Sequence, residues 1–296
     1  MIAVMPEAKK IDSVQDFFDF PLSYKRIFGV SIAFKQGNKE DQHLSFETKV
    51  TLIRDSSSQF PLLEIDRYNL FINRQMPSYI GDKLAHDCGK VIYPALISLD
   101  KRFGMVAVKN QQAMLERWAL SKEKIKEKHS GEVVLWYLNK AEKTLMDKTL
   151  LFRSLQQDLF LTAFCAPLYE TPASLKKNVY VDLNIPIIPF TKPIVYKTEQ
   201  KILQTKDSEN TITIVQKGQV SDERSGFDLV AKNAIAVGIV DNKDKAKGTL
   251  DAVYELNSKT SVIESIRAHY TIDLPDNESR EISLNAFYLK EKDYLL

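Results

Sequence analysis

Cysteine and glycine are scarce in this chain. Of its 296 residues only two are cysteine, Cys88 and Cys165, and ten are glycine. Two thiols exclude a disulfide scaffold, and they cannot by themselves provide a four-thiolate metal site. The glycine-rich patterns G-x-x-x-x-G-K-[ST] and G-x-G-x-x-G are both absent. The two commonest nucleotide-binding signatures are therefore missing.

An excess of charge of one sign is also lacking. The sequence has 41 Lys+Arg against 39 Asp+Glu, a net charge of +2. A nucleic-acid partner is not expected, because such proteins carry clustered positive charge. The lysine-rich run at 121–128 is interspersed with Glu123 and Glu127, which is typical of a solvated helix face. No run reaches the roughly 20 apolar residues that span a bilayer, so no membrane span is predicted.

Catalytic and metal-binding motifs are missing too. G-x-S-x-G, H-E-x-x-H and C-x-x-C do not occur, so we expect no cofactor and no metal. A cysteine nucleophile would need a histidine brought close by the fold, and the available histidines are His43, His86, His129 and His269. His86 and Cys88 are two residues apart on a predicted helix and would point to different faces. Cys165 is predicted to be an inert buried thiol.

Asp158 is the acidic residue that merits inspection, because it lies in an apolar run. Burial would raise its pKa or require a partner for its charge. The favoured interpretation is that Asp158 is a helix residue whose side chain lies on the solvent side of its turn.

Alternation of apolar and polar residues is the strongest pattern that the sequence does contain. A period of two predicts strands with one face on a core, as in antiparallel sheets, at residues 28–34, 44–52, 93–99, 105–108, 194–202, 212–214, 262–274 and 282–288. The phase of the alternation changes between 63–65 and 68–72, and this change predicts a β-bulge or a strong bend.

Helical periodicity dominates the middle of the chain. A short helix is predicted from Ser78 to about Val91, with Ser78 as its N-cap. Apolar stripes then indicate helices around 114–125 and 134–145. Residues 151–164 are apolar on more than one face and should form the most buried helix.

The order of strands, helices and strands indicates an α+β fold with antiparallel sheet. Strands this long must twist and curl the sheet. We therefore predict long curved antiparallel strands in two groups flanking a central helical block, as a half-barrel-like sheet packed on helices. This order of elements resembles the half-barrel of bacterial lipoprotein-carrier proteins. The resemblance implies a cupped sheet that holds lipid chains.

The predicted organisation is an N-terminal arm or helix at 1–22 and a single α+β domain at 23–296. Within that domain we expect N-terminal strands at 23–109, a helical block at 110–170 and C-terminal strands at 178–296. The first residues place an apolar run before the lysines, the reverse of a secretory signal. This favours a cytoplasmic chain, with an exported mature chain whose signal was removed as the alternative.

Aromatic residues are plentiful, with 12 Tyr, 15 Phe and 2 Trp. Those of the helical block are either plain core packing or the lining of an apolar cavity or patch, which makes candidate binding residues of Trp118, Trp136, Tyr137, Phe152, Phe160 and Phe164. The leading hypothesis is a non-catalytic binding or interaction protein that engages a partner protein or an apolar ligand through the concave face of a curved sheet. The alternatives are a hydrolase with catalytic residues distant in sequence and a structural subunit of a larger assembly.

Overall fold

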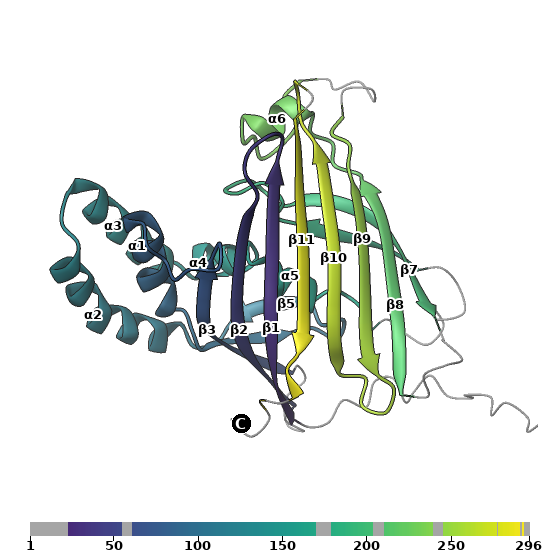
Figure 1. Cartoon of the computed structure of the whole chain (residues 1–296), viewed down its shortest axis with the longest axis horizontal. Helices are drawn as coiled ribbons and strands as arrows, with labels where there is room; N and C mark the ends of the chain where they lie inside the picture. Colours follow the sequence, from purple (N-terminus) through teal and green to yellow (C-terminus); the bar gives the residue numbers. More distant parts are fainter. Residues whose placement is uncertain are drawn as a thin grey trace, which may run out of the picture.

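One open antiparallel sheet of eleven strands organises the molecule (Figure 1). The computed structural model describes residues 23–54, 61–169, 179–203, 210–238, 245–276, 278–290 and 292. The strand order is β5-β4-β3-β2-β1-β11-β10-β9-β8-β7-β6. The predicted α+β fold with antiparallel sheet is confirmed. The predicted arm at 1–22 lies outside the described residues, and the single domain at 23–296 stays a prediction.

The strands fall into two groups along the chain, and pairing of β1 with β11 joins the groups into one sheet. The strand bounds are β1 Ser23–Gln36, β2 Gln42–Ile53, β3 Leu62–Ile72, β4 Ala95–Leu99, β5 Met105–Val108, β6 Val179–Ile185, β7 Ile194–Leu203, β8 Thr211–Val220, β9 Thr249–Asn257, β10 Ile263–Asp273 and β11 Ser279–Tyr288. Most of these strands are long enough for native twist to curl the sheet.

The predicted β-bulge lies in β3. Ser45 pairs with Phe71 and Glu47 with Tyr68, so one residue of β2 faces two residues of β3. Asn69 takes up the extra length with a φ of 53°. Asparagine tolerates this left-handed conformation better than most residues. The bulge explains the phase change in the sequence, because one extra residue reverses which face each side chain takes.

Six helices are described, and their bounds are α1 Ile80–Lys90, α2 Gln111–Lys128, α3 Glu132–Met146, α4 Lys148–Leu155, α5 Leu159–Phe164 and α6 Gly226–Val230. The predicted N-cap at Ser78 is wrong. The cap position of α1 is Tyr79, which makes no side-chain capping bond. Ser78 lies one residue too early for its hydroxyl to reach the first free N–H groups of the helix.

Two short helices, α4 and α5, carry the main contacts of the helical block with the sheet, and α4 contacts the edge strand β5. α5 contacts β6, β10 and β11, so strands four or more positions apart in the sheet approach the same helix and the sheet is curled around it. α1, α2 and α3 stand to one side of β3 and pack on one another (Figure 1). The prediction that helices pack on the concave side therefore holds for α5, while α1–α3 form a body of their own.

Two apolar clusters result. The sheet core lies between the curled sheet and α5 and includes Phe28, Phe160, Phe164, Leu284 and Ala286. The helical core lies among the first four helices and consists of Leu84, Cys88, Val91, Ala95, Met114, Trp118, Ile125, Val134, Leu138, Leu145 and Leu151.

Asp158 lies at the junction of the two cores. Its carboxylate caps α5 by accepting from the backbone N–H of Leu161 at 2.9 Å. The same carboxylate forms an ion pair with Arg67, whose guanidinium lies 4.0 Å from the ring centroid of Phe46 and 4.8 Å from that of Tyr93. Both charged side chains are largely buried. The favoured sequence reading placed Asp158 on the solvent side of its turn, and the structure gives it a buried partner instead.

Candidate functional site

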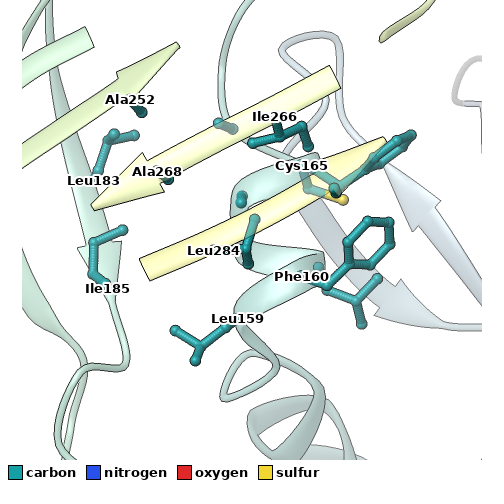
Figure 2. Packing of buried hydrophobic residues seen from close by; sticks show 14 of the residues in the cluster. Leu159, Phe160, Cys165, Leu183, Ile185, Ala252, Ile266, Ala268 and Leu284 are labelled. Atoms are coloured by element: carbon teal, nitrogen blue, oxygen red, sulfur yellow. The ribbon is translucent and has the colours of Figure 1, made fainter. Parts of the chain in front are cut away.

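The inner face of the sheet, on the side of α5, carries a continuous row of side chains across five strands. The row is defined by register pairs that join Leu284 to Ala268, Ala268 to Ala252, Ala252 to Gln216 and Gln216 to Gln200. Directly paired residues project from the same face of a sheet. We call these five residues the inner row. Figure 2 shows the three apolar members of the row, with Leu284 next to α5 and Ala268 and Ala252 on the successive strands farther from it.

A buried glutamine pair ends the inner row. Gln216 Nε2 donates to Gln200 Oε1 at 2.8 Å, and Gln200 Nε2 donates to the carbonyl oxygen of Leu168 at 3.3 Å. Gln216 is fully buried. Within the described part of the chain, its Oε1 has no hydrogen-bond partner. An unsatisfied buried acceptor costs about 1–3 kcal/mol.

The residues that flank the inner row on β6 and α5 are apolar and belong to the sheet core. Leu183, Ala268 and Leu159 keep 7%, 6% and 9% of their surface exposed, whereas Phe160 and Leu284 keep none. Ile185, also on β6, keeps 2%, so these side chains are all largely buried, with a small residual exposure on the side of β6. Figure 2 shows Leu183 on β6, at a distance from the side chains of α5.

Tyrosine hydroxyls on the inner face are already engaged by backbone. Tyr196 donates to the carbonyl of Thr271 at 2.7 Å, and Tyr254 donates to that of Ala163 at 3.2 Å. Burial raises the pKa of both phenols, so they stay neutral. The free polar group of the inner row is thus the Gln216 acceptor, and the five row residues offer no titratable group for acid–base chemistry.

The six aromatic residues predicted from sequence do not come together. Phe160 and Phe164 lie in the sheet core, where their ring centroids are 5.4 Å apart. Trp118 lies in the helical core and Tyr137 packs against it. Phe152 is half-buried on α4, and Trp136 is 61% exposed on α3. They therefore do not line one common cavity.

Gln200 and Gln216 were not predicted from the sequence. A signal was present, because each occupies the inward phase of an alternating strand. Gln216 continues the alternation of Ile212 and Ile214, and Gln200 lies between Thr198 and Ile202. A polar residue in the apolar phase of a strand marks a buried polar site.

The cysteines considered for nucleophilic chemistry lie in settings that disfavour a thiolate. Burial, followed by the charge of Asp87, raises the pKa of Cys88 to about 11. Burial also raises the pKa of Cys165. Reactive cysteines have lowered pKa values instead.

His86 lies half-buried on the same helix as Cys88, and burial lowers its pKa. Among the described residues, no group of three or more histidine, cysteine or acidic side chains is placed to hold a metal ion. In the same residues no helix has the length and apolar character needed to cross a membrane.

Comparison with known proteins gave weak likenesses. No family model and no curated protein matches the sequence. Among solved structures, one on lipid–protein interactions in lipovitellin aligns with 91% of this chain at 10% identity and a TM-score of 0.48. The chain spans 25% of that lipovitellin chain. A LolA superfamily protein from Nitrosomonas europaea aligns over 94% of this chain and 92% of its own, at 7% identity and a TM-score of 0.17. Both TM-scores are below 0.5, so neither likeness bears on function.

Proposed function

We propose that the chain is a non-catalytic binding protein that holds an apolar ligand on the inner face of its curled sheet. The ligand class is an unbranched hydrocarbon chain that ends in a neutral hydrogen-bond donor, such as a long-chain alcohol. The observation that carries the proposal is the unpaired Oε1 of Gln216 at the end of an apolar row.

Hydrophobic transfer would supply most of the binding free energy. Each methylene removed from water contributes about 0.8 kcal/mol. Ala252 and Ala268 place small side chains at the centre of the row, and Leu183 and Leu159 keep 7% and 9% of their surface exposed. A flexible hydrocarbon chain suits such a surface, because it makes no polar demand that the surface cannot meet.

Gln216 would supply orientation. A donor on the ligand satisfies an acceptor that is otherwise buried without a partner, and a ligand without a donor leaves it unsatisfied. Gln200 keeps Gln216 in place, because it occupies the Gln216 amide N–H and is itself fixed to the Leu168 carbonyl. The glutamine pair thus supports discrimination between ligands that carry a hydrogen-bond donor and ligands that lack one.

The test is a calorimetric titration with two matched probes, 1-decanol and decyl methyl ether. Wild-type protein should bind the alcohol about three- to tenfold more tightly than the ether, the value of one neutral hydrogen bond. Gln216→Met keeps the length of the side chain without the acceptor. It should abolish the preference and retain binding of the ether.

Gln219→Met is the matched control, because Gln219 lies on the same strand but is exposed. It should leave the preference unchanged. Ala268→Leu fills the row without touching the glutamines and should weaken both probes alike. Failure of wild-type protein to bind either probe contradicts the proposal, as does a preference that survives Gln216→Met.

A further inference from the structure

α6 lies at one end of the sheet (Figure 1). A group of large apolar side chains is exposed on this helix and on the segments around it. We call it the apolar rim, and its members, each between 58% and 80% exposed, are Phe190, Phe227, Val230, Ile235 and Val237. Isolated exposed apolar residues are common on proteins, but a group of this kind marks an interaction site.

Hydrogen bonds inside the protein fix the segments that carry the apolar rim. Phe227 and Val230 are three residues apart on α6 and so share one helix face. The chain after α6 is folded back onto the helix by Asp228, whose carboxylate accepts from Asn233 Nδ2 at 3.0 Å and from the N–H of Val237 at 3.3 Å. The segment that carries Ile235 and Val237 is therefore anchored at both ends.

A buried ion pair connects the segment that carries Phe190 to the loop after α6. Arg224 forms a two-bond pair with Asp222, at 2.8 Å and 2.7 Å. It also donates to the carbonyl oxygens of Asn233, Lys192 and Pro193. One guanidinium thus links the loop after α6 with the segment that precedes β7. Buried pairs with every remaining donor engaged hold a geometry firmly.

Phe190 is the most exposed member, at 80%, and its φ is 62°. Bulky side chains rarely adopt a positive φ, and the conformation has a cost of about 1–3 kcal/mol. The chain therefore presents an aromatic ring to solvent in a conformation that neither burial nor backbone preference favours.

Cations lie directly on the apolar rim. Lys140 Nζ is 5.2 Å from the ring centroid of Phe190 and 5.1 Å from that of Trp136, and Lys232 Nζ is 5.4 Å from that of Phe190. Trp136, exposed on α3, is joined to the rim by this contact. In the described ranges neither lysine forms an ion pair, so both charges are available.

From this combination we infer that the apolar rim docks on a lipid surface that carries anionic headgroups. Phenylalanine, tryptophan and aliphatic side chains enter the boundary between headgroups and acyl chains, and neighbouring lysines reach the headgroups. A protein partner is less favoured, because lysine is depleted in the cores of protein interfaces. This inference goes beyond the proposed function and does not require that the inner face bind a ligand.

The test is co-sedimentation with vesicles of phosphatidylcholine alone and of phosphatidylcholine with phosphatidylserine. Wild-type protein should prefer the anionic vesicles. Phe190→Ser with Phe227→Ser should lower partitioning at least about tenfold on both, because each phenylalanine loses most of its transfer free energy. Lys140→Glu with Lys232→Glu should reduce the preference for anionic vesicles by about fivefold or more per lysine.

Two controls match these variants. Tyr79→Ser removes an aromatic side chain that is 79% exposed but lies beside α1, and it should not alter partitioning. Lys124→Glu with Lys128→Glu makes the same change in net charge on an exposed face of α2 and should retain most of the preference. Unchanged urea midpoints show that the variants are folded.

A change in fluorescence provides a second readout. Trp118 and Trp136 are the only tryptophans in the sequence, and Trp118 is buried. Acyl chains brominated near the headgroup should therefore quench Trp136 selectively. The inference is overturned if wild-type protein binds neither vesicle, or if the phenylalanine variant binds as wild type does. It is also overturned if the protein ignores vesicles and forms a dimer that the phenylalanine variant abolishes, since the rim would then be covered by a second copy.

Discussion

The sheet core and the helical core differ in the sequence separation of the residues that form them. The helical core uses residues between Leu84 and Leu151, whereas the sheet core joins β1 to β11 and so closes over most of the chain. Contacts between distant residues form only when the whole fold forms, and local helical contacts can open separately. We therefore expect the helical core to be the less stable unit, coupled to the sheet core through the Asp158–Arg67 pair.

The largest effect should follow from cutting that coupling. Asp158→Ala leaves the Arg67 guanidinium buried without its carboxylate, at a cost of about 3–5 kcal/mol, and removes the cap of α5, at about 1 kcal/mol more. Both cores should be destabilised, as measured by urea unfolding followed by circular dichroism.

Asp158→Asn is the informative companion, because asparagine can still cap α5 but carries no charge. Asp158→Asn should therefore recover only the free energy of the helix cap and not that of the ion pair. Equal stability of Asp158→Ala and wild type would show that the two cores are not coupled through this residue.

Cavities should affect the two cores unequally. Phe160→Ala removes a ring packed between Phe28 and Phe46 and should lower the free energy of unfolding of the whole chain by about 3–5 kcal/mol. Leu138→Ala, in the helical core, should cost about 2–4 kcal/mol. Of these two variants, only Leu138→Ala should increase the separation between the unfolding of the helical core and that of the sheet, with the helical core unfolding first.

A Trp136→Phe background makes this visible, because Trp118 in the helical core is then the sole tryptophan. Trp118 fluorescence should change at lower urea than the sheet signal in the far-ultraviolet. A single coincident transition in the Leu138→Ala variant would mean that the cores unfold as one unit.

The smallest effect should come from acid. Hydrogen bonds from Lys122, opposed by burial and aided by Trp118, lower the pKa of Glu142. A carboxyl whose pKa is depressed in the folded state stabilises the fold above its unfolded pKa of about 4.3, and this contribution is lost as pH falls through the folded pKa. The change should be at most about 1 kcal/mol, because the pair is partly exposed.

Trp118 should report this titration, since its Nε1 donates to Glu142 at 3.2 Å. In the Trp136→Phe background the fluorescence should shift below about pH 4. Glu142→Gln should remove the step. A step that persists in that variant would assign the titration to another group.

Nine of the eleven strands were predicted from sequence, because alternation of apolar and polar residues marks a strand with one buried face. β6 and β9 were not predicted, although their burial also alternates along the strand. The places of the first three helices along the chain were also predicted, but the surfaces against which the helices pack could not be. An amphipathic pattern tells which face is buried but not against what, and α2 and α3 bury theirs against each other. The exposed side of α3 also carries Val133, Leu135 and Trp136, so apolar character alone did not identify the core.

The glutamine pair was the part of the candidate site that sequence could have provided. Periodicity placed Tyr196, Thr198 and Ile202 on one face, and the position between the last two, Gln200, belonged to the same face. Its hydrogen bond to Gln216 depends on the register of β7 with β8, which no local pattern determines.

The sheet ends at β5 on one side and β6 on the other, and these edges do not pair with each other within the described residues. A sheet joined into a ring has its circumference fixed by its strand number and stagger. Here the curl is set by twist and by contact with α5, so the edges can separate or approach while every ladder hydrogen bond stays in place. We therefore expect the width of the interior to be adjustable, so that the ligand proposed for the inner face would be accommodated by flexing the sheet instead of rebuilding it.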